Sequence, residues 1–187
     1  RPGYPRPGHV YADYYWTLLG WKELRSAATL LGKVDDALWA DGYYGVFKAA
    51  VARSLRTHLE RRETAWLPAV AEEERVDAAS IALLFWPCDE TDLVEPHELQ
   101  SSLDQIYAQF LERGGVASDP AAEAHLLMPL AAVGRGDYAR EILYALLATR
   151  RPTNWHAWPT ILSGESRPSG AAAGFMPNIR AAAAYVL

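Results

Sequence analysis

The chain has 187 residues, of which 50% are hydrophobic and 22% charged, and this balance excludes a disordered chain. Its net charge of -5 lacks the basic footprint of nucleic-acid-binding domains, and its one cysteine, Cys88, excludes a disulfide framework and a cysteine-built zinc site. No apolar run approaches the roughly 18 residues that a membrane span needs. We therefore predict one folded domain over 1–187, with no nucleic-acid partner and no membrane span.

Residue 1 is Arg, and no charged segment followed by an apolar one comes after it, so no signal peptide is visible. A start at Arg is consistent with a piece cut from a longer chain. The compartment therefore stays open.

The first two predicted helices cover 11–31 and 35–62. Apolar residues recur at helical spacing from Tyr11 to Leu31, and Gly32 is a natural C-terminal stop. Asp35 or Asp36 is the expected cap of the second helix. The side chains expected to bury on that helix are Leu38, Trp39, Tyr43, Val46, Phe47, Ala50, Leu55 and Leu59.

A third helix is predicted over 76–86, where Pro87 ends it, and a fourth over 98–113, closed by Gly114 and Gly115. The polar loop between them holds Asp89, Glu90 and Asp92, and we expect these carboxylates to be solvated.

Asp119 and Pro120 open a predicted fifth helix to Val133, which Pro129 should kink or divide. Asp137 caps a sixth helix to about Arg150. A loop rich in Trp, Pro and Gly spans 151–176, and a last helix is predicted over 178–187. No segment alternates with the period of a strand, so the predicted fold class is all-α, built of antiparallel hairpins that pair 11–31 with 35–62, 76–86 with 98–113, and 120–133 with 137–150.

Two N-terminal stretches resemble the six-hairpin glycosidase superfamily, the glucoamylase-like toroids of twelve helices. The segment HVYADYYWTLLG, from His9 to Gly20, is similar to the family's acidic and aromatic residues at the mouth of a helix ahead of a glycine. The Ala-rich helix before Pro87 is similar to an inner helix of the toroid.

The tail carries the third part of the resemblance. WHAWP, from Trp155 to Pro159, precedes GFMPN, from Gly174 to Asn178, which is similar to a Trp-Pro loop followed by a Gly-Asp-Met-Pro-His helix start. The resemblance implies stacked hairpins that form the C-terminal half of an (α/α) toroid, with the remainder in a missing N-terminal half or an oligomer partner. It also implies an oligosaccharide or glycoside substrate, and no cofactor.

Glycoside cleavage needs two carboxyl groups, roughly 5 Å apart for retention and roughly 6.5–9.5 Å apart for inversion. Asp13, near a helix start, and Glu165, in the tail loop, are the predicted catalytic pair. Helix capping is the alternative for Asp13, and a solvated loop charge is the alternative for Glu165.

Aromatic and polar residues near these carboxylates are the predicted substrate-binding set, since the apolar face of a sugar packs on an indole. This set comprises His9, Tyr15, Trp16, Trp155, His156, Trp158 and Asn178. The other tryptophans, Trp21, Trp39, Trp66 and Trp86, follow helical patterns and are expected in the core.

Two other chemistries are weaker. Cys88 and His97 share one loop, but a packed thiol is the better interpretation of Cys88. Asp35, Asp36 and Asp41 lack the spacing of a magnesium cluster, and we propose no metal site. The alternative to a carbohydrate-active domain is a non-catalytic helical-hairpin scaffold for protein interaction. The direction in which the tryptophans point discriminates between the two.

Overall fold

The computed structural model describes residues 8–62, 64–115 and 120–148. These residues form helices and turns with no β-strand, which confirms the all-α class. The chain divides into two compact units, Arg1–Ser102 and Leu103–Leu187. The toroid and the single domain over 1–187 stay predictions. None of the helices in the described ranges is long and apolar enough to cross a bilayer.

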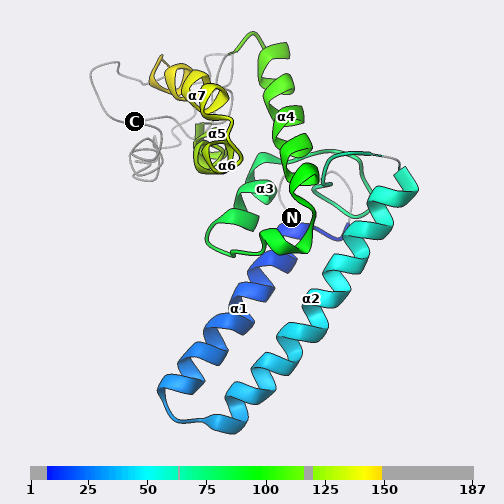
Figure 1. The fold of residues 1–187 in the computed structure, drawn as a ribbon, viewed down its shortest axis with the longest axis vertical. Coiled ribbons are helices and arrows are strands. Elements are labelled where there is room, and N and C mark those ends of the chain that lie inside the picture. Colours follow the sequence, from blue (N-terminus) through cyan, green and yellow to red (C-terminus); the bar gives the residue numbers. More distant parts are fainter. Residues whose placement is uncertain (1–7, 63, 116–119, 149–187) are drawn as a thin grey trace, which may run out of the picture. The chain divides into compact units, whose positions relative to one another are not determined.

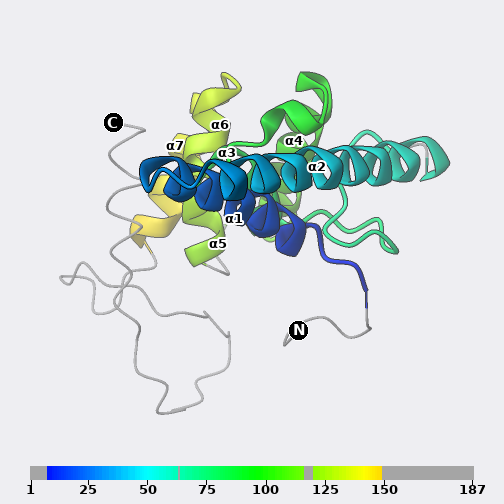
Figure 2. The same ribbon diagram turned by 90° about the horizontal axis from the view of Figure 1, so that it is seen from below.

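The first unit is built around a long antiparallel hairpin of α1 (Tyr11–Leu30) and α2 (Val34–Arg62), as predicted (Figures 1 and 2). The turn between them is a glycine-terminated helix end. Gly32 has a φ of 69°, and the Lys33 N–H donates to the Ala28 carbonyl at 2.8 Å. Gly32 is therefore the predicted stop, because a left-handed φ costs glycine little.

The interior of the hairpin lies toward its open end. Tyr11, Tyr15 and Leu18 of α1 are buried there, with Val51 and Leu55 of α2. The hydroxyl groups of Tyr11 and Ser54 share a hydrogen bond of 2.8 Å. The closed end of the hairpin extends away from α3 (Figure 1).

The remaining elements of the first unit pack beside this hairpin. α3 (Ala78–Phe85) begins after Asp77, whose side chain accepts hydrogen bonds from the Ser80 N–H at 3.0 Å and from the Ser80 hydroxyl at 2.7 Å. α3 packs against α1. Its predicted hairpin with 98–113 stays a prediction, because residues 103–112 of α4 belong to the second unit. The 3-10 helix η1 (Thr91–Leu93) contacts α2, and α4 (Pro96–Glu112) follows it.

The second unit holds the end of α4 with α5 (Pro120–His125), α6 (Leu127–Ala132) and α7 (Gly136–Ala148). Pro129 divides the predicted fifth helix as expected. Its missing N–H leaves the carbonyl of His125 without a helical donor, and the helix breaks at Leu126. α5 and α6 pack on α7, which confirms that predicted pair. The loop 151–176 and the helix 178–187 lie outside the described residues.

Candidate functional site

The predicted catalytic residue Asp13 lies in the first turn of α1 and is exposed. Trp16, three residues further along, lies on the same side of the helix with 46% of its surface exposed. Five other members of the predicted site lie outside the described residues, so their roles stay predictions. They are Glu165, Trp155, His156, Trp158 and Asn178.

His9 and Tyr15 do not line one cleft. His9 contacts Glu72, and Tyr15 is buried in the core. The His9 backbone N–H donates to Glu72 Oε2 at 2.9 Å, and its ring Nδ1 contacts Glu72 Oε1. Hydrogen bonds from His9 hold the pKa of Glu72 below its ordinary value. Tyr15 is only 1% exposed, and burial raises the pKa of its hydroxyl. The structure thus places Tyr15 in the core, where it does not face solvent.

Glu90 is a buried carboxylate that the sequence suggested to be solvated. Its side chain is fully buried, and the Nζ atoms of Lys22 and Lys48 each lie 2.9 Å from one of its oxygens. The hydroxyl of Tyr44 donates to the same carboxylate at 3.0 Å. Lys48 also donates to Asp92 at 2.7 Å. Lys22 comes from α1 and Lys48 from α2, so Glu90 fastens its loop to both helices of the hairpin.

Charge pairing around Glu90 shifts the titration of Lys48. Burial by itself lowers the pKa of Lys48, but hydrogen bonds to Asp92, Glu90 and Tyr44 outweigh it and raise the pKa above its ordinary value. The ammonium therefore stays charged. Within the described ranges, no three His, Cys, Asp or Glu side chains gather as metal ligands would. The ion pairs of Glu90 with both helices make this cluster a structural clamp.

The Cys88 thiol next to this clamp is packed and not activated. It is fully buried, and burial raises its pKa to about 11. A thiolate is the reactive form of cysteine, so this environment suppresses nucleophilic chemistry. His97 is exposed at the start of α4.

The clearest departure from expectation is an apolar surface on the hairpin. Several residues predicted to bury on α2 are exposed: Leu38 by 67%, Trp39 by 51%, Tyr43 by 52% and Val46 by 74%. Trp86, also expected in the core, is 67% exposed. The prediction of burial is wrong at these positions. For the residues of α2 the reason is that the rest of the first unit covers only one side of the hairpin.

Helical geometry shows which side is covered. At about 100° per residue, Trp39, Tyr43, Val46 and Ala50 fall on one stripe of α2. Lys48 lies roughly on the opposite side of that helix, where it holds Glu90 and Asp92. The loop after α3 therefore packs on one side of α2 and leaves the other side bare.

Two residues of α1 extend this bare surface. Trp21 contacts both aromatic rings of the α2 stripe, with ring centroids 5.2 Å from Trp39 and 5.3 Å from Tyr43. Leu24, three residues after Trp21, is 40% exposed. We call the surface formed by Trp21, Leu24, Trp39, Tyr43, Val46 and Ala50 the free face.

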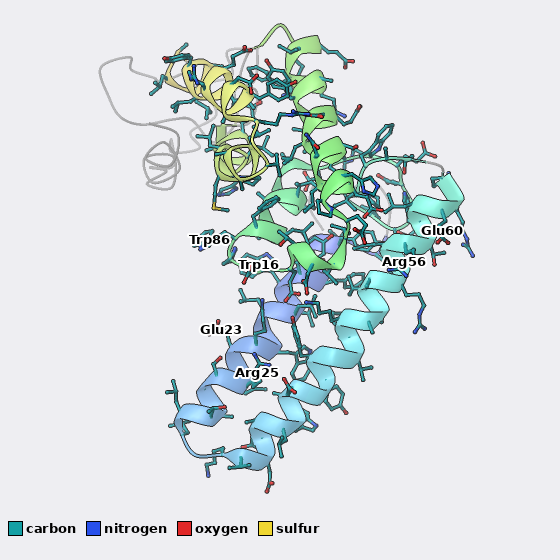
Figure 3. The ribbon with its side chains drawn as sticks, viewed as in Figure 1. Trp16, Glu23, Arg25, Arg56, Glu60 and Trp86 are labelled. Carbon is teal, nitrogen blue, oxygen red and sulfur yellow. The ribbon has the colours of Figure 1, made fainter. Side chains whose placement is uncertain are left out.

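The six residues that form the free face are all uncharged. Figure 3 shows Glu23 on the side of α1 away from α2, and Glu60 near the C-terminal end of α2. Trp16 also projects outward from α1 (Figure 3). An apolar surface with a charged rim has the anatomy of a protein interface.

Two glycines beside the free face also favour an interface there. Gly42 and Gly45 lie inside α2, where a glycine costs about 0.5–1 kcal/mol relative to alanine. A Cβ atom added at either position would meet no atom within 4 Å. Packing among the described residues thus gives no reason for these glycines.

Comparison with known proteins assigns no class to this fold and site. No family model, no curated protein and no solved structure matches the chain. The resemblance to six-hairpin glycosidases stays a prediction, and the function must be inferred from the site itself.

Proposed function

We propose that this chain is a non-catalytic helical docking module whose free face binds an apolar helical surface. The observation that carries the proposal is the exposure of Trp39, Tyr43 and Val46 on one stripe of α2 without an intervening charge. Monomeric soluble proteins rarely expose contiguous apolar patches of more than a few hundred Å². Patches larger than that mark interaction sites. Burial of such a patch is favourable by about 25 cal/mol per Å².

The support behind the free face favours binding. Glu90 fastens its loop to both helices through Lys22 and Lys48, on the side opposite to the stripe. A surface held rigid before association loses less conformational entropy when a partner binds. Trp and Tyr are also the residues that most often dominate binding energy at interfaces.

A photo-crosslinking experiment tests this proposal. A benzoylphenylalanine in place of Val46 should form adducts in the cells that make the protein. The matched control places the same group at Leu30, which is 88% exposed but lies about 120° around α1 from Leu24 and about 180° from Trp21. Adducts that form at position 46 and not at position 30 support the proposal. No adduct at position 46, or the same adducts at both positions, contradicts it.

Binding or hydrolysis of a glycosidic substrate is the second candidate function. The shared exposure of Asp13 and Trp16 on one side of α1 favours it. A thermal melt against a panel of α- and β-linked oligosaccharides, with sugar release read in the same wells, tests it. Saturable stabilisation that disappears in Trp16→Ala is the expected result. A melt indifferent to every sugar rejects this candidate.

A further inference from the structure

We infer that the occupant of the free face is a second copy of this chain, with the two α2 helices packed antiparallel about a two-fold axis between residues 44 and 45. This inference rests on the proposed function and names its partner. It is carried by the spacing, the sizes and the charges of the exposed residues along α2.

The spacing is that of a coiled-coil seam. Steps of three and four residues connect the exposed positions Asp36, Trp39, Tyr43, Val46, Ala50 and Arg53. This alternation keeps one seam of a helix against another helix. The seam is about 26 Å long, at 1.5 Å per residue. It starts with an acid, ends with a base, and is apolar between them.

Side-chain sizes complement one another when the seam meets its own copy in the antiparallel direction. The two-fold axis places Trp39 opposite Ala50 of the second copy, so that a large side chain meets a small one. It places Tyr43 opposite Val46, two side chains of intermediate size. A closed two-fold interface requires this kind of self-complementarity, since the same surface serves both sides.

Charges complement one another in the same register. Asp36 lies opposite Arg53 of the second copy, and the flanking Asp35 lies close to Arg56. Asp36 and Arg53 are exposed and pair with no residue in the described part of the chain. A parallel arrangement would instead place Asp36 beside Asp36 and Arg53 beside Arg53. Like charges at those positions are repulsive, so the antiparallel direction is selected.

The glycine of the seam's flank fits this arrangement. Gly42 and Ala49 lie seven residues apart on the same edge of the seam, and the two-fold axis brings Gly42 near Ala49 of the second copy. Small flanking residues let two helix backbones approach closely. This contact supplies a packing reason for Gly42, which has none within the described residues.

The first test is the oligomeric state of the purified 187-residue chain, measured by sedimentation equilibrium over a range of concentrations. The wild-type chain should be a dimer. Val46→Asp should be monomeric, because it places a carboxylate against Tyr43 of the second copy. Leu30→Asp is the control, an equally apolar exposed position off the seam, and it should remain a dimer. Circular dichroism should show the same helix content in all three.

A charge swap tests the register without disturbing the apolar residues. Asp36→Arg and Arg53→Asp should each raise the dimer dissociation constant about tenfold, because each replaces two attractive pairs by two repulsive ones. The double variant should return the constant to within about threefold of the wild type. A failure of this rescue overturns the antiparallel register.

The two proposals fail differently. A folded chain that is monomeric at every concentration, but whose position 46 crosslinks to other proteins in the cell, overturns the second copy and leaves the docking face standing. A dimer that Val46→Asp does not weaken also overturns the inference. If position 46 forms no adduct and the chain is monomeric, both proposals fail.

Discussion

At the scale of single residues, Glu90 is a buried carboxylate that connects its loop to α1 and α2. Its carboxylate is fully buried, forms ion pairs with two ammonium groups and accepts a hydrogen bond from a phenol. Only three lysines occur in the whole sequence, and two of them are used here. Loss of one member of a buried ion pair leaves the other charges uncompensated, which costs more than the pair itself contributes.

Glu90→Gln should lower the free energy of unfolding by about 3 kcal/mol, because it leaves the Lys22 ammonium without its carboxylate and Lys48 with Asp92 alone. Urea unfolding followed by circular dichroism measures this. Glu60→Gln is the matched control, an exposed glutamate of α2, and should change the free energy of unfolding by less than about 0.5 kcal/mol. Equal effects of the two substitutions would show that Glu90 is not a clamp.

The contact between His9 and Glu72 predicts a pH effect of known sign. Hydrogen bonds from His9 place the pKa of Glu72 below its ordinary value of 4.5 in the folded chain. The contact therefore stabilises the fold above about pH 4.5, and this contribution is lost as the pH falls through the lowered pKa. Both side chains are largely exposed, so salt should weaken the effect.

Carboxyl-resolved NMR titration measures that pKa directly. His9→Ala should raise the pKa of Glu72 toward 4.5, because the side-chain hydrogen bond is removed. An unchanged Glu72 would contradict the contact.

At the scale of helices and turns, local sequence signals predicted where several helices end or break. Gly32 ends the first helical segment, Pro129 divides the fifth, and α2 ends at Arg62 as predicted. These features depend on the backbone chemistry of one or two residues, so neighbouring elements do not alter them. The pairing of the third and fourth helices stays a prediction, because most of α4 belongs to the second unit.

Two glycines of the hairpin should respond to alanine in opposite directions. Gly45→Ala should raise the free energy of unfolding by about 0.5–1 kcal/mol, because Gly45 lies inside a helix and the added Cβ would enter open space. Gly32→Ala has the same open space but a φ of 69°, so it should lower that free energy by about 1 kcal/mol. Chemical denaturation of both variants measures the pair. A stabilising Gly32→Ala would contradict the left-handed turn.

At the scale of the whole molecule, association and stability are linked. A dimer that forms only from folded chains adds free energy that grows with protein concentration. The melting temperature of the wild type should therefore rise with concentration, while that of Val46→Asp should stay constant. Calorimetry over a hundredfold concentration range tests this. If the melting temperatures of the two chains depend on concentration in the same way, association through the free face does not stabilise the fold.

The candidate site itself was only partly accessible from the sequence. Spacing marked Leu38, Trp39, Tyr43 and Val46 as one apolar set, and the structure shows the same set on α2. The sequence placed this set in the core, because helical periodicity identifies an apolar side of a helix without saying what covers it. The alternation of Asp36, the apolar residues and Arg53 was present in the sequence as a signal of a seam.

The sequence by itself determined the all-α class and the ends of most helices, since caps, glycines and prolines act within a turn of the chain. The tertiary structure decided which apolar residues are buried. Glu90 draws its loop onto the side of α2 that carries Lys48, and this leaves Trp39, Tyr43 and Val46 in solvent. Burial depends on where distant segments meet, and that contact joins residues more than forty positions apart.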